Sequence, residues 1–170
     1  MIESPKKLLE LQGKLITGNE KIVSAAIVSL RNEDPFKGAI GLLASLFDST
    51  NDLIIKDLVH SFMSDIKEPG ARTEVVAEAN KSYKPETICM LVSTCWQSGL
   101  DYSEFAGDFA KIFFTGDYMT ALECFTVIEE SAGNMALSKK TEIIEFLEKN
   151  NKGLSVEKGV LLNALITALN

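Results

Sequence analysis

The side chains best suited to chemistry are few and scattered along the chain. His60 is the only histidine, so a Ser-His-Asp system would have to use it. The pattern Ser-x-x-Lys, found in serine acyl enzymes, occurs at Ser4/Lys7, Ser64/Lys67 and Ser155/Lys158. The Ser-Asp-Asn and Lys-Thr-Gly sequences that accompany it in those enzymes are absent. We therefore expect no catalytic residues: Ser4 and Ser155 cap helices, and His60 is a polar residue on a helix flank.

Metal and cofactor chemistry is equally hard to place. Cys89, Cys95 and Cys124 form no Cys-x-x-Cys pair, and each lies among apolar residues. This usage predicts buried free thiols in a reducing compartment, with no metal site. Gly38-x-x-Gly41 lacks the strand and turn of a phosphate loop, so close helix packing is the better explanation and no cofactor is expected.

Acidic residues recur on one flank of a predicted helix, at Asp101, Glu104 and Asp108. A catalytic carboxylate pair needs an apolar cleft that raises a pKa, and nothing in the sequence indicates one here. We interpret the three carboxylates as a solvated face.

The overall charge narrows the classes of partner. The chain has 170 residues and a formal charge of −7. Phosphate backbones and anionic membrane surfaces attract basic proteins, so neither is an expected partner. The most apolar early window, 38–47, is too short to span a bilayer, and the first residues lack the apolar run of a signal peptide. These features predict a soluble cytoplasmic protein.

Apolar periodicity and turn residues predict ten helices and no strands. Their expected ranges are about 4–16, 19–31, 35–49, 52–65, 71–82, 85–96, 101–114, 117–131, 138–150 and 155–170. Short connections should make neighbouring helices pair antiparallel. We predict one domain, 1–170, of about five helix pairs, with boundaries near 4–32, 35–66, 70–98, 101–131 and 138–170.

A repeat connects these pairs. Asn19, Asp52, Pro85 and Asp117 begin the second helix of four pairs and follow one another at steps of 33, 33 and 32 residues. The same step aligns four columns, all apolar except Ser29: Ile22/Ile55/Ile88/Ala121, Ala25/Leu58/Leu91/Cys124, Ala26/Val59/Val92/Phe125 and Ser29/Phe62/Cys95/Ile128. Their spacing of i, i+3, i+4 and i+7 is one helix face, which predicts a buried stripe on every second helix.

The segment LLASLFDSTNDLIIKDLVHSF, at 42–62, resembles the turn and second helix of a HEAT repeat. The segment LLELQGKLITGNEKIVSAAIVSL, at 8–30, carries a looser likeness. The chain thus resembles the HEAT and armadillo class, although the basic Lys56 is replaced by Cys89 and Leu122 in later units. The resemblance implies an all-α, right-handed α-solenoid that holds partners along the surface of its second helices.

On that reading the chain is a non-catalytic scaffold for protein interactions in the cytoplasm. Flank positions of the second helices include Met90, and Trp96 lies near the end of the same helix. Methionine and tryptophan are common interface anchors, although filling of the core is the favoured interpretation for both. The expected contact residues for a protein or peptide are His60, Met90, Ser93, Thr94, Gln97 and Glu123.

Two other functions and one further contact are compatible with the sequence. An enzyme on a helical-repeat scaffold, such as a DNA-repair glycosylase, would need a basic groove that the composition does not favour. A plain helical bundle without repeats is the other alternative. The C-terminal helix, GVLLNALITALN, is apolar nearly all round, and therefore another copy of the chain or a partner is a candidate to cover it.

Overall fold

Ten α-helices and four short 3-10 turns make up the chain, and the computed structural model describes residues 1–170. The helices are α1 Pro5–Leu15, α2 Glu20–Ser29, α3 Ala39–Ser49, α4 Leu53–Ser64, α5 Arg72–Ala79, α6 Pro85–Gln97, α7 Ala106–Thr115, α8 Tyr118–Ser131, α9 Leu137–Lys149 and α10 Val156–Leu169. Between them lie η1 Leu30–Asn32, η2 Pro69–Ala71, η3 Ser103–Phe105 and η4 Ala132–Asn134. The predicted all-α fold is confirmed.

Polar side chains in the turn within each pair cap the N-termini of most second helices. The Asn19 carboxamide accepts the N–H of Lys21 at 3.1 Å, and the Asp52 carboxylate accepts that of Ile54 at 2.9 Å. Asp117 and Ser155 cap α8 and α10 in the same way, while α6 begins with Pro85. The capping roles predicted for Ser4 and Ser155 are confirmed.

Two helix starts were predicted wrongly. α7 begins at Ala106 and not at Asp101, because the 3-10 turn η3 precedes it. The third helix does not begin at Pro35; it begins at Ala39, after Gly38, whose φ is +88°. Residues 35–37 instead pair with the N-terminal segment, because Ile2 N–H donates to the Pro35 carbonyl at 3.1 Å and Lys37 N–H donates to the Ile2 carbonyl at 2.9 Å. These bonds hold the segment extended and bury Phe36.

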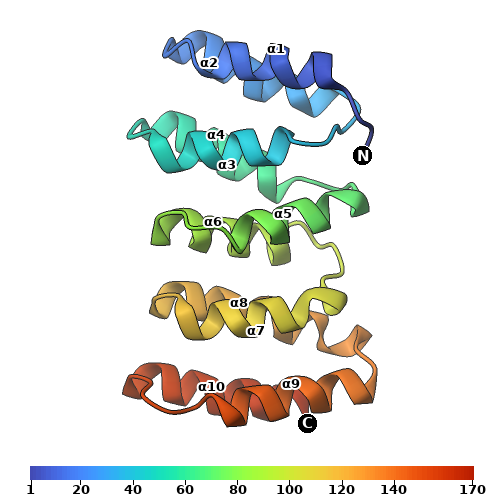
Figure 1. Ribbon diagram of the computed structural model, residues 1–170, viewed down its shortest axis with the longest axis vertical. Helices are drawn as coiled ribbons and strands as arrows, with labels where there is room; N and C mark the ends of the chain where they lie inside the picture. The colour runs from blue at the N-terminus through green and yellow to red at the C-terminus, as the bar shows by residue number, and fades with distance from the viewer.

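The helices form five pairs that lie one above another along the longest axis of the molecule (Figure 1). The second helices pack in series, α2 on α4, α4 on α6, α6 on α8 and α8 on α10. The first helices do the same from α1 to α3 to α5 and from α7 to α9. α5 has only eight residues, and a cleft of about 390 Å³ lies between its C-terminal end and α7.

One apolar core runs through all five pairs. α6, in the middle, is buried almost all round, whereas α2 leaves Ile22 and Ala25 exposed. The predicted stripe is therefore displaced by about one residue on α2: the predicted Ala26 is buried, but Val23 and Ile27 are buried in place of Ile22 and Ala25. The first pair has a neighbour on one side only, so its outer face meets solvent and its buried face turns toward α4.

Candidate interaction surface

The six predicted contact residues lie on α4, α6 and α8, and the structure divides them into two groups. Met90, Ser93 and Thr94 are buried, with exposed fractions of 6%, 7% and 2%. Met90 therefore fills the core, as the favoured interpretation of the sequence predicted, because α6 lies between α4 and α8 and both neighbours cover its sides. His60, Gln97 and Glu123 remain partly exposed.

His60 and Gln97 join the second helices of two successive pairs. His60 Nε2 lies 3.1 Å from the carboxamide oxygen of Gln97, which only accepts, so the imidazole donates. Ser64 Oγ donates to the same oxygen at 2.6 Å, and Ser93 Oγ lies 3.5 Å from His60 Nε2. Four polar side chains therefore bridge α4 and α6: His60, Ser64, Ser93 and Gln97. They are not arranged in series as the nucleophile, base and acid of a catalytic triad.

The same bridging continues along the stack in both directions. The Trp96 indole N–H, on α6, donates to the Glu123 carboxylate, on α8, at 2.7 Å. Arg31, after α2, reaches α4 with bonds of 2.5 Å to Asp65 and 2.9 Å to Ser61. We call these bridges, from α2 through α8, the polar row. Trp96 is 40% exposed beside it, so an aromatic ring already held by a hydrogen bond faces solvent.

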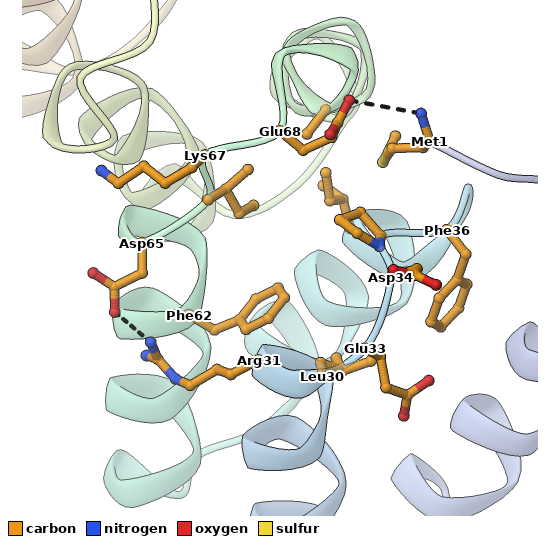
Figure 2. A pocket seen from close by; sticks show the side chains of 15 residues that line it. Met1, Leu30, Arg31, Glu33, Asp34, Phe36, Phe62, Asp65, Lys67 and Glu68 are labelled. Atoms are coloured by element: carbon orange, nitrogen blue, oxygen red, sulfur yellow. Dashed lines mark hydrogen bonds and ion pairs between the residues drawn. The ribbon is translucent and has the colours of Figure 1, made fainter.

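A second feature lies at the edge of the stack where one pair leads into the next. We call it the linker cleft: a hollow of about 460 Å³ between the α2–α3 linker, at 30–38, and the α4–α5 linker, at 65–71. Figure 2 shows Phe62 pointing into it from α4, with Met1 at its upper rim. Its other apolar lining residues are Leu30, Pro35, Phe36, Ala39, Ile40, Ile66 and Ala71.

Charged side chains surround this apolar floor. Arg31 and Asp65 form their ion pair on one side, and the Glu68 carboxylate lies 3.9 Å from the Met1 amino nitrogen on the other (Figure 2). Lys67 points away from the cleft, because its Nζ donates to the Ser98 carbonyl at the end of α6 at 2.6 Å. Asp34 lines the cleft without an ion-pair partner.

The remaining reactive groups are inside the protein or locally paired. Burial raises the pKa of the Cys95 thiol to about 12 and also raises the pKa of Cys124. Glu104 pairs with Arg72 at 2.9 Å, while Asp108 pairs with Lys111 at 3.5 Å. The predicted acidic flank is thus divided between separate cations. No group of three or more His, Cys, Asp or Glu side chains is placed to hold a metal ion.

The Gly38-x-x-Gly41 segment has the packing role that the sequence predicts. A Cβ on Gly41 would lie 2.9 Å from Glu78 Oε1, and the N–H of Gly38 donates to Glu74 at 2.8 Å. The absence of a side chain at Gly41 therefore lets the Glu78 carboxylate of α5 approach the first turn of α3, where Glu74 also accepts a backbone N–H.

The C-terminal helix buries one side and leaves the other open. Leu161, Leu162, Leu165 and Leu169 pack inward, while Val156 and Val160 are 82% and 66% exposed. Self-association through this face stays a prediction. No helix of the chain is both long enough and apolar enough to cross a bilayer.

No protein-family model, curated protein or solved structure matches the chain. The linker cleft was not predicted from the sequence, because its residues lie in two linkers about 35 positions apart that only the stacking of pairs brings together. The one local signal was apolar side chains within polar linkers, such as Phe36 in Asp34-Pro35-Phe36 and Ile66 before Lys67.

Proposed function

We propose that the protein is a non-catalytic interaction scaffold, an α-solenoid of the HEAT and armadillo type that binds another protein or a peptide. Serial packing of the second helices on one another supports this architecture. The accessible surface of 8868 Å² also supports it, because a compact chain of 18.6 kDa would expose roughly 8,200 Å². The three free cysteines suit the reducing interior of a cell.

The observation that carries the proposal is the exposed Trp96 within the polar row. Binding costs conformational entropy for each side chain that must be ordered, and a side chain already held in place avoids part of that cost. Trp96 is held by Glu123, and the neighbouring Gln97 is held by His60 and Ser64. Tryptophan is also the residue most enriched among energetic anchors of interfaces. The revised contact surface is therefore His60, Trp96, Gln97 and Glu123, without the buried Met90, Ser93 and Thr94.

Affinity capture from the source cell tests the proposal. The full chain serves as bait, beside a variant carrying Trp96→Ala and Gln97→Lys. Gln12→Lys, on the exposed side of α1, is a control with the same added charge away from the polar row. Circular dichroism first establishes that all three baits are folded.

We expect a protein retained by the wild type and by Gln12→Lys to be lost from the double variant. Retention by all three baits removes the polar row as the contact surface. Failure to retain any protein, in capture and in covalent cross-linking within the cell, contradicts the scaffold function itself.

A further inference from the structure

The linker cleft has a floor that can take a large apolar side chain. Phe62 and Ile66 are half-buried in the absence of any partner, and they form the floor together with the buried Ile40. The hollow of about 460 Å³ lies within the usual size range of ligand sites, and it opens to solvent at the edge of the stack. An apolar group that enters it removes its own surface and part of the two half-buried side chains from water.

The charged side chains at the rim of the linker cleft determine which charge a bound segment should carry. All three cations in the lining are already bound within the protein: Arg31 to Asp65 and Ser61, Lys67 to the Ser98 carbonyl, and the Met1 amino group to the Glu68 carboxylate at 3.9 Å. Of the four carboxylates in the lining, Glu33 pairs with Lys7 and Asp65 with Arg31, which leaves Asp34 and the weakly paired Glu68. Asp34 has no ion-pair partner, and Glu68 accepts only the N–H of Gly70 at 3.2 Å and the more distant Met1 amino group. The free charge at the rim is therefore negative, like the net charge of −7.

We propose that the linker cleft binds a segment of a partner protein in which a bulky apolar side chain is flanked by lysine or arginine. The apolar side chain lies against Phe62, Ile66 and Ile40, and the flanking cations approach Asp34 and Glu68. Opposite charges at the rim orient the segment and exclude acidic ones. This inference rests on the proposed scaffold function and specifies the chemistry of a partner, at a site separate from Trp96.

Three short peptides are the probes. The first is acetyl-Lys-Lys-Phe-Lys-Lys-amide; the second has alanine in place of phenylalanine, and the third has glutamate in place of every lysine. Each is titrated into the ¹⁵N-labelled full chain, and amide shifts are followed by NMR. We expect the first peptide to shift the amides of Ile66, Glu68 and Gly70, and the alanine peptide to bind at least about tenfold more weakly.

Charge reversal at the rim sharpens the test. The variant Asp34→Lys with Glu68→Lys should weaken the basic phenylalanine peptide by about tenfold or more and should bind the glutamate peptide instead. The control, Glu129→Lys with Glu130→Lys, makes the same change in net charge at exposed residues near the end of α8. It should change affinity for the basic peptide by less than about twofold.

Three results overturn the inference. The first is equal weakening by both double variants, which means that net charge alone attracts the peptide. The second is binding of the phenylalanine and alanine peptides to the wild type with equal affinity, and the third is amide shifts in the wild type that map away from the cleft. The last two do not depend on whether a variant folds. None of the three bears on capture through Trp96, so the cleft can fail while the scaffold function stands.

Discussion

The Glu74 carboxylate, on α5, accepts the backbone N–H of Gly38 at 2.8 Å and thereby caps α3 in the preceding pair. Gly38 carries no side chain that can cap the helix itself, and its φ of +88° suits glycine. The cap of one helix is thus supplied by the next pair, so α3 is completed by stacking and not by local sequence.

The Glu74 cap predicts a pH dependence of stability. Burial, only partly offset by the hydrogen bonds from Gly41 and Gly38, raises the pKa of Glu74 above the ordinary value of 4.5. At pH values between the ordinary pKa of the unfolded chain and the raised pKa of the folded protein, the folded state binds more protons than the unfolded state. The contribution of Glu74 to stability therefore falls as the pH rises. We expect Glu74→Gln to become more stable relative to the wild type as the pH rises above about 4.5, in urea unfolding followed by circular dichroism. Glu145→Gln, on the exposed face of α9, is the matched control, and a parallel trend in both variants would contradict this assignment.

Two glycines inside helices should respond oppositely to alanine. Gly13, in α1, has nothing within 4 Å of its missing Cβ, so Gly13→Ala should raise the free energy of unfolding by about 0.5–1 kcal/mol. At Gly41 the new Cβ meets the buried Glu78 carboxylate, which Lys81 and Tyr83 hold in place. We expect Gly41→Ala to lower that free energy by about 1–3 kcal/mol in the same unfolding assay. Equal stabilisation at both sites would show that Glu78 can move aside.

Because Met90 is buried, a substitution there should affect the stability of the fold. Met90→Lys places a charge among buried side chains and should lower the free energy of unfolding by about 2–5 kcal/mol. Gln97→Lys, on the partly exposed side of the same helix, loses only its bonds to His60 and Ser64 and should cost about 1–2 kcal/mol. Thermal unfolding compares the two, and a Met90 variant as stable as wild type would place that side chain at the surface after all.

The three cysteines should differ in reactivity. Burial raises the pKa of all three thiols, but Cys95 and Cys124 are fully buried, whereas Cys89 is only half-buried. Thiolate is the reactive form, and therefore the native protein should expose at most one thiol to Ellman's reagent, from Cys89, while the unfolded chain exposes all three. Cys89→Ser should abolish the native reaction, and rapid modification that persists in this variant would contradict the burial of the other two.

An array and a bundle of the same helices differ in shape. A compact chain of 170 residues has a radius of gyration of roughly 15 Å. Stacked pairs should give a larger value and an asymmetric distribution of interatomic distances in small-angle X-ray scattering. A symmetric distribution at the compact radius would favour the plain helical bundle over the α-solenoid.

The sequence by itself determined the helices and where most of them begin. Capping residues such as Asn19 and Asp52 bond to backbone N–H groups two or three residues away, and the apolar period is a property of a single helix. Both can therefore be recognised from the sequence without the tertiary structure. Local sequence rules failed where a residue instead bonds to a segment far away in the sequence. Pro35 is a good helix start by sequence, yet its carbonyl bonds to Ile2 and α3 begins four residues later.

Only the tertiary structure decided which residues on the helix flanks stay exposed. Met90 and Gln97 lie on the same helix, and nothing local distinguishes a flank covered by the next pair from one left open. The linker cleft depends on the same stacking, since Leu30, after α2, and Phe62, on α4, come from different pairs. Burial at these positions is set by the distance and angle between neighbouring pairs, which depend on the packing of many side chains at once and which no single segment encodes.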